Sequence, residues 1–251
     1  MRRSIEQLVN QQVLRWTEEQ RAVERRSTPP EETPRPIICI SREFGAQAGD
    51  LAQRVAARLN FDVCDQDLVD EIAKQAHVRR KVVESLDERM QSGIRDWVDE
   101  MMAQPRFTPS DYLRNLSQVV LTLGSHGRSV IIGRGAHLIL NPSHTLRVRC
   151  HAPFRYRVEQ VAERHGISIS RAEVLTTRVD NERTEFYRRN FNTDVADPSS
   201  FDLMINVSTM SLAARTLLVV DAFEAKFPEL DAPPQSGIVY DGNRGGREAV
   251  G

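Results

Sequence analysis

The chain has 251 residues, enough to bury a sizeable core, and it fits one α/β domain with modest extensions. Its 34 Lys and Arg residues are balanced by 35 Asp and Glu residues, and the formal net charge of −1 argues against a protein whose main task is to wrap nucleic acid. There is no run of 18 apolar residues and no apolar signal segment at the N-terminus, so we expect a cytoplasmic protein that does not bind membranes or nucleic acid.

Residues 1–26 predict an amphipathic helix. Apolar residues recur there every three to four positions, at Ile5, Leu8, Val9, Val13 and Trp16. We interpret this segment as a helix that packs against the domain or joins two copies of the chain in a homodimer. Residues 27–36 carry four prolines, which excludes a helix and predicts a linker.

In residues 37–226, short apolar runs alternate with longer helical patterns, which predicts that these residues form the main domain. The runs that predict strands cover residues 37–40, 61–64, 130–135, 146–150 and 203–207. The helical patterns cover residues 51–59, 68–125 with a break near 104–109, 154–190 and 211–226. Strands that alternate with helices favour a mostly parallel, doubly wound sheet. From residue 227 to 251, Pro, Gly and charged residues predict a disordered tail.

The three cysteines, Cys39, Cys64 and Cys150, lie in or beside the apolar runs. An odd number without paired spacing is typical of buried free thiols in a reducing compartment. None has a partner at the spacing of metal ligands except His151, which directly follows Cys150. No histidine pairs with Asp and Ser at a spacing that would indicate a hydrolase triad.

The segment Ser41–Asp50 follows the first predicted strand and precedes a helical pattern, which is where an open parallel sheet binds its ligand. Gly45 and Gly49 allow backbone N–H groups to turn inward around an anion, and the start of the helix adds partial positive charge. The pattern G-x-x-x-x-G-K-[ST] is absent. The loop by itself therefore indicates a phosphate site and a plain strand-to-helix turn equally.

Five segments resemble, in order, those of the cytidylate kinase-like proteins, relatives of the bacterial cytidylate kinases. They are ICISREFGAQAGDLAQRVAARL, CDQDLVDEIA, VIIGRGAHLIL, HAPFRYRVEQVAERHGIS and RVDNERTEFYRRNF with ADPSSFDLMINVSTMS, and together they span residues 36–225. The resemblance implies a three-layer α/β/α P-loop NTPase-like fold with a helical lid. It also implies ATP-dependent phosphoryl transfer to a nucleoside monophosphate, with CMP or dCMP as the first candidate and ATP and Mg²⁺ as cofactors.

The resemblance assigns roles residue by residue. The nucleotide-binding and phosphate-binding positions would be Ser41, Arg42, Gly45, Ala46, Gln47, Ala48, Gly49 and Asp50. Ala48 stands where cytidylate kinases carry the lysine of the loop, and Asp50 where they carry the hydroxyl group that binds Mg²⁺, so Asp50 is the candidate metal ligand. Arg157 and Arg183 match lid arginines that reach the transferred phosphoryl group, which makes them the catalytic candidates.

The acceptor would bind near Asp65, Arg134 and Tyr187, with Tyr187 either stacking on it or packing the lid. Asp67 is expected to cap the helix whose first apolar residue is Leu68. Asp197 matches a family position, although an Asp before Pro198 is equally typical of a turn.

Gln47, Ala48 and Asp50 replace the residues usual at these positions, which favours a rival hypothesis. The chain would then be a degenerate kinase that binds a nucleotide for regulation without catalysis. A kinase of an unrelated small molecule is the second rival. Without the lysine, a catalytic protein would have to supply positive charge through its arginines.

Overall fold

The computed structural model describes residues 13, 14, 16, 18 and 36–228. Its strands form one sheet: β1 (Ile37–Arg42), β2 (Asp62–Cys64), β3 (Ser129–Ile132), β4 (Thr145–His151) and β5 (Leu203–Asn206). Within the described part of the chain, their spatial order is β2-β3-β1-β4-β5 and each pairing of neighbours is parallel. The predicted strands and the parallel sheet are confirmed, with β1 at the centre.

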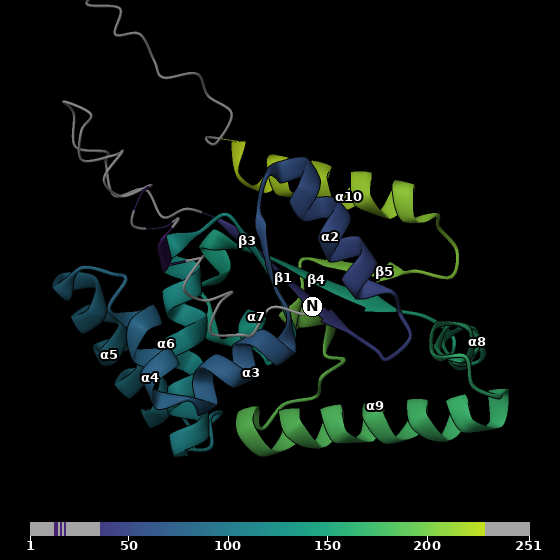
Figure 1. Cartoon of the computed structure of the whole chain (residues 1–251), viewed down its shortest axis with the longest axis horizontal. Coiled ribbons are helices and arrows are strands. Elements are labelled where there is room, and N and C mark those ends of the chain that lie inside the picture. Colours follow the sequence, from purple (N-terminus) through teal and green to yellow (C-terminus); the bar gives the residue numbers. More distant parts are fainter. Residues whose placement is uncertain (1–12, 15, 17, 19–35, 229–251) are drawn as a thin grey trace, which may run out of the picture.

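Helices cover both faces of the sheet. They are α2 (Ala48–Leu59), α3 (Gln66–Lys74), α4 (Ala76–Val83), α5 (Glu88–Ala103), α6 (Asp111–His126), α7 (Ala136–Ile139), α8 (Phe154–His165), α9 (Ile169–Phe191) and α10 (Leu212–Lys226), with 3₁₀ turns at Pro142–His144 and Pro198–Ser200. Figure 1 shows α2 and α10 on one face and the group α3–α7 on the other. This arrangement confirms the predicted three-layer α/β/α fold.

The alternation of side chains along β1 explains the two layers. Ile38 and Ile40 pack with the buried residues of α2 and α10, whereas Ile37 and Cys39 pack with those of α3–α6. Because successive side chains of a strand point to opposite faces, one apolar run serves two separate cores. This burial on both faces is the physical reason for the unbroken apolar run at the start of the domain.

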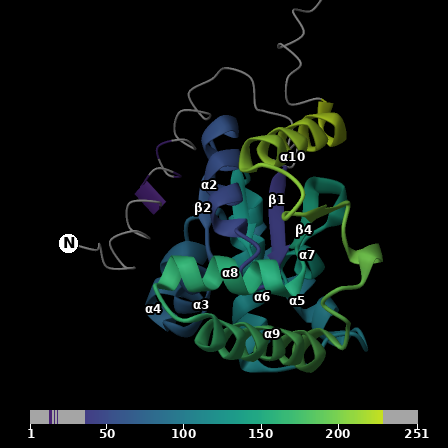
Figure 2. The same ribbon diagram turned by 90° about the vertical axis from the view of Figure 1, so that its right-hand side faces the viewer.

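Helices α8 and α9 form a hairpin beside the end of the sheet where α2 begins (Figures 1 and 2). The predicted helical stretch over 154–190 is divided at Gly166, which caps α8 with a left-handed φ of +61°. Val158 and Val161 of α8 pack with Ala172 of α9 in a small core of their own. The hairpin also joins the cores of the sheet, because Tyr187 and Phe191 of α9 pack with the residues of α3–α6 and Tyr156 of α8 packs against the core beneath α2 and α10.

The prediction that Asp67 caps the following helix is wrong. Helix α3 begins at Gln66, its N-cap is Asp65, and the Asp65 carboxylate accepts the backbone N–H of Leu68 at 2.9 Å. Asp67 lies inside the first turn. The apolar pattern placed the start of the helix too late, because the first turn of α3 carries polar residues. The expected break near 104–109 is confirmed between α5 and α6.

The N-terminal segment packs against α6 through Trp16. Its indole stacks on the His126 ring with centroids 3.8 Å apart, and 8% of Trp16 is exposed. This contact favours the packing interpretation for the described residues. Most of the predicted helix 1–26, the linker residues 27–35 and residues 229–251 of the predicted tail lie outside the described residues.

All three cysteines are buried and outside any disulfide, as predicted. None of the described helices is both long and apolar enough to cross a membrane.

Candidate functional site

The loop between β1 and α2 is shaped by two residues with positive φ. Gly45 has a φ of +81°, and a Cβ atom there would lie 2.5 Å from the carbonyl oxygen of Arg157, so the close approach of α8 requires glycine. Gln47, the N-cap of α2, has φ 50° and ψ 27°. Left-handed backbone costs a residue with a Cβ on the order of 1 kcal/mol. Ala48 is already helical and carries no such strain.

The side chain of Gln47 fixes this left-handed turn by three hydrogen bonds. Its Nε2 donates to Oε1 of Gln160. Its Oε1 accepts from the hydroxyl of Tyr156 at 3.2 Å and from Nη2 of Arg215 at 3.0 Å. The loop is therefore connected to α8, which carries Tyr156 and Gln160, and to α10, which carries Arg215.

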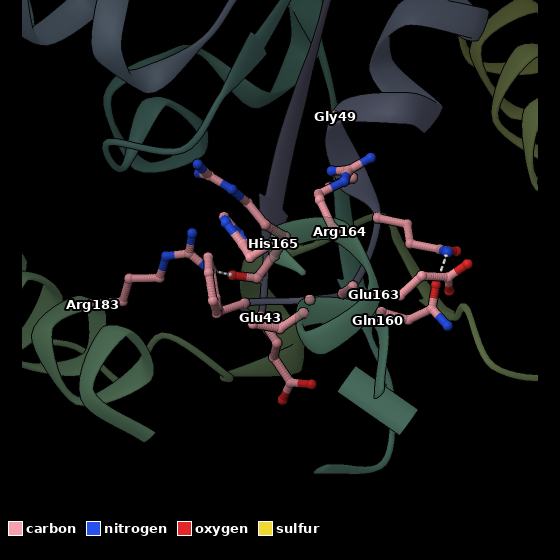
Figure 3. A pocket seen from close by; sticks show the side chains of 14 residues that line it. Glu43, Gly49, Gln160, Glu163, Arg164, His165 and Arg183 are labelled. Carbon is pink, nitrogen blue, oxygen red and sulfur yellow. Dashed lines mark hydrogen bonds between the residues drawn. The ribbon is translucent and has the colours of Figure 1, made fainter. Parts of the chain in front are cut away.

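A pocket of about 430 Å³ lies between the loop and the helical hairpin. Its lining comprises loop residues 42–49, Gln160, Val161, Glu163, Arg164 and His165 of α8, and Arg183 of α9. Figure 3 shows Arg183 and Gln160 on two sides of this pocket. Beside it, Asp50 in the first turn of α2 forms an ion pair with Arg164 of α8. The loop and the hairpin thus face each other across a space open to a small ligand.

Arg42 and Arg183 place positive charge at the pocket. Nη2 of Arg42 donates to Gln66 Oε1 at 2.7 Å, and Nη1 of Arg183 donates to the carbonyl oxygen of Arg42 at 3.2 Å. No carboxylate of the described chain lies within 4.0 Å of either guanidinium group. Burial lowers the pKa of Arg42, and burial together with the charge of Arg42 lowers the pKa of Arg183 to about 10. Arg183 therefore stays charged at neutral pH, and an anion in the pocket would complement the guanidinium groups.

Arg157, the other catalytic candidate, lies behind the loop and outside the pocket lining. Only 7% of it is exposed. Its Nε lies 3.1 Å from Oε2 of Glu43 and its Nη1 lies 2.5 Å from Oδ2 of Asp180. Nη1 also donates to the carbonyl oxygen of Phe44 at 3.0 Å. Arg157 is thus occupied by two carboxylates and a loop carbonyl, which hold the hairpin against the loop.

Two of the predicted acceptor residues, Asp65 and Arg134, follow the ends of β2 and β3, near Arg42, whereas the third, Tyr187, lies on α9. Arg134 pairs with Asp70 of α3 and its guanidinium carbon lies 5.0 Å from the centre of the Phe186 ring. A Cβ atom at the preceding Gly133 would clash with Nη1 of Arg42, so the Arg42 side chain lies directly over this glycine. Asp65 and Asp67 act electrostatically on Arg42. Arg42 therefore bridges the loop and the predicted acceptor region.

Tyr187 is buried, with 4% exposed, and lies among aromatic rings that include His137 and Phe191. Burial raises the pKa of its hydroxyl group, which forms a hydrogen bond with the side chain of Ser41. Of the two roles left open for Tyr187, the structure favours packing. Asp197 accepts the backbone N–H of Ser199 at 2.9 Å, which confirms turn chemistry at that position.

Several residues of the site were missed from the sequence. Asp180 could have been found, since it lies three positions before Arg183 in the D-x-x-R pattern, and both face the same side of α9. Gln160, Arg164 and Arg215 carried no signal, because charged and polar residues on a helix are usually solvated.

The residues of the pocket region could hold a metal ion only together with a bound ligand that supplies most of its coordinating oxygen atoms. Across residues 36–228 and the few described positions before them, no group of three or more His, Cys, Asp or Glu residues gathers around one point. Asp50 offers one carboxylate at the start of α2, at present paired with Arg164. Mg²⁺ needs no more than one or two carboxylates when phosphate oxygens and water complete its shell.

Comparison with known proteins decides the family. The family model described as the cytidylate kinase-like family matches residues 37–209. The chain belongs to this family. The match contains the whole loop, the predicted acceptor region and the helical hairpin, so the resemblance to this family is confirmed.

Individual relatives match shorter stretches. The cytidylate kinase of Pyrococcus horikoshii is 29% identical over 119 residues, which are 47% of this chain and 62% of that protein. The uronate isomerase of Corynebacterium glutamicum is 29% identical over 120 residues, 47% of this chain and 23% of that protein. The chain thus covers less than two thirds of either relative. A crystal structure of an uncharacterized protein from Eubacterium ventriosum shares the fold, with a TM-score of 0.59 and 20% identity over 76% of this chain and 99% of that one.

Proposed function

We propose that the protein is an ATP-dependent kinase of a nucleoside monophosphate, with CMP or dCMP as the first acceptor to test. The observation that carries the proposal is the pair Arg42 and Arg183. Both guanidinium groups lie beside the loop Gly45–Gly49 without a carboxylate from the described chain. Phosphoryl transfer depends on the neutralisation of charge and on positioning, and this pair supplies both.

The phosphates of ATP would lie in the pocket between the loop and α8. There the backbone N–H groups and the start of the twelve-residue helix α2 favour an anion. Mg²⁺ would be held by the carboxylate of Asp50, once that group is released from Arg164, and would neutralise part of the charge of the phosphates.

Arg183 is the arginine that we expect to contact the transferred phosphoryl group, because it lines the pocket and Arg157 does not. Arg157 would position the loop through Phe44 and Glu43. Arg42 and Arg134 would hold the acceptor phosphate at the end of β3, near Asp65. The two substrates would then meet at Arg42, between the loop and the acceptor region.

The test measures ADP released from MgATP in the presence of each ribonucleoside and deoxyribonucleoside monophosphate in turn. We expect release with CMP or dCMP and its loss in Arg183→Met. Absence of ADP with every acceptor, in a protein that still binds ATP, would rule out this kinase activity.

A regulatory nucleotide-binding domain is the second candidate. The contacts of Gln47 with Gln160 and of Asp50 with Arg164 favour it, because both join the hairpin to a loop that has Ala48 in place of lysine. Binding of ATP without turnover would support this function. Turnover confined to acceptors other than nucleotides would instead indicate a kinase of another small molecule.

A further inference from the structure

Arg215 in the first turns of α10 is a buried arginine without a counter-charge. Only 3% of it is exposed. Its Nη2 donates to Oε1 of Gln47 at 3.0 Å and its Nε donates to the carbonyl oxygen of Ser211 at 3.3 Å. Its Nη1 is buried and has no hydrogen-bond partner among the described residues. Among the described residues, no carboxylate oxygen lies within 4.0 Å of the Arg215 guanidinium group.

A buried guanidinium group without an anion is unfavourable, because burial removes its hydration and the two hydrogen bonds of Arg215 replace only part of it. A chain that only needed a stable α10 would do as well with an apolar side chain at this position. The charge is instead held at the N-cap of α2, where the helix also directs partial positive charge towards the loop. An anion bound at the loop would stabilise both the buried charge of Arg215 and the partial positive charge at the start of α2.

Gln47 connects this charge to the loop. Its carboxamide oxygen is shared by Arg215 and Tyr156, and the same side chain holds the left-handed turn before α2. The next residue, Ala48, offers no charge in place of the lysine that a standard phosphate loop carries. Arg215 therefore brings a positive charge close to the position that lacks the lysine, and Gln47 connects that charge to the loop.

We propose that Arg215 is a positioning residue of the phosphate loop, which acts through Gln47 and supplies a fixed positive charge for the polyphosphate of a bound nucleotide. The inference rests on the proposed function only in naming a polyphosphate as the ligand. Arg215 itself stays buried and need not contact the phosphates. A charge held in a medium of low dielectric still acts strongly on an anion a few ångströms away.

The test measures binding of MgATP and of inorganic tripolyphosphate to the full chain by titration calorimetry, for wild type, Arg215→Met and Arg215→Lys. We expect Arg215→Met to weaken the binding of both probes about tenfold. Arg215→Lys keeps the charge and should stay within about threefold of wild type. The loss of tripolyphosphate affinity caused by Arg215→Met should be smaller at high salt, since added ions screen the attraction between the protein and the anion.

Thermal unfolding without ligand separates this role from a structural one. The melting temperature of Arg215→Met should equal or exceed that of wild type, because the buried charge is removed. Arg58→Met, at the exposed far end of α2, removes the same charge away from the loop and should leave both affinities unchanged. Should Arg215→Met fail to fold, Gln47→Leu disconnects the charge from the loop and is expected to weaken binding as well.

Unchanged affinity in a folded Arg215→Met protein, or equal weakening in Arg215→Lys, would overturn the proposal. So would failure of the wild-type chain to bind either probe. If only the proposed kinase activity is wrong, MgATP and tripolyphosphate should still bind with an affinity that depends on Arg215, but no ADP should be released with any acceptor.

Discussion

Asp180 and Arg157 form a short ion pair, with Oδ2 of the carboxylate 2.5 Å from Nη1 of the guanidinium group. The other oxygen of Asp180 accepts the backbone N–H of Phe44 at 2.9 Å. One carboxylate of α9 thus fixes both an arginine of α8 and the backbone of the loop. The geometry of the pocket depends on this pair, although neither residue lines it.

Replacement of Asp180 by Ala should destabilise the protein. Arg157 would remain buried with Glu43 as its one carboxylate, and the N–H of Phe44 would lose its acceptor. Removal of one partner from a buried pair typically lowers the free energy of unfolding by about 3 kcal/mol. Urea unfolding followed by circular dichroism measures the change.

Glu182→Ala is the matched control for this change. Glu182 lies on the same helix and its exposed side chain pairs with exposed Arg178 at 3.8 Å. The expected loss there is below about 0.5 kcal/mol. Equal urea midpoints for the two variants would contradict the role given to Asp180.

Arg183→Met should lower kcat by a factor of about 10² to 10³, with little change in the stability of the fold. Removal of one preformed contact to developing charge typically has an effect of this size. Arg183 has no carboxylate partner in the described structure, so its loss leaves no buried counter-charge behind. Steady-state kinetics with MgATP and the best acceptor provide the measurement.

Arg178→Met serves as the control for Arg183, since it removes an exposed arginine from the same helix. Its kcat should match that of wild type. If the two variants retained equal activity, Arg183 could not be the residue that contacts the phosphoryl group.

His137 should make the protein less stable below pH 6.5. Burial, together with the positive charges of Arg147, Arg149 and Arg106, lowers the pKa of its imidazole to about 3. The unfolded chain therefore binds a proton at about pH 6.5 that the folded chain does not bind until about pH 3. This contribution to stability is complete above pH 6.5 and is lost as the pH falls through that window. From pH 7.5 to pH 5 the loss amounts to about 2 kcal/mol.

The non-titrating variant His137→Phe should remove that part of the pH dependence. Urea midpoints at pH 7.5 and pH 5 report the difference. The exposed His77→Gln should keep the slope of wild type. A His137→Phe protein with the full wild-type slope would show that this histidine titrates normally.

The three cysteines should be unreactive in the native protein. Burial is the main cause that raises the pKa of Cys64 and of Cys150 to about 12, and it also raises that of Cys39. At pH 8 the reactive thiolate form is then scarce and shielded. Ellman's reagent should label no thiol before unfolding and all three in urea. A native thiol that reacted as fast as free cysteine would contradict this expectation.

The sequence by itself determined the layered fold and the place of the site. Apolar runs such as Ile37–Ile40 can be satisfied only by burial on both faces of a sheet, and helical periodicity is equally local. The topology of such a sheet then brings its ligand to the loop after the central strand, where the pocket lies. The glycines of the loop alone left a plain turn equally open, and the resemblance in five segments favoured a phosphate site.

Only the tertiary structure decided what each polar side chain does there. Arg157 and Arg183 look alike in the sequence, yet one is held by Glu43 and Asp180 whereas the other faces the pocket. In the sequence Gln47 is only a departure from the residue usual in the family, but its contact with Arg215 joins positions 168 residues apart. The role of a charged group depends on which carboxylates or dipoles lie within a few ångströms of it. Those neighbours come from distant parts of the chain, which no local pattern records.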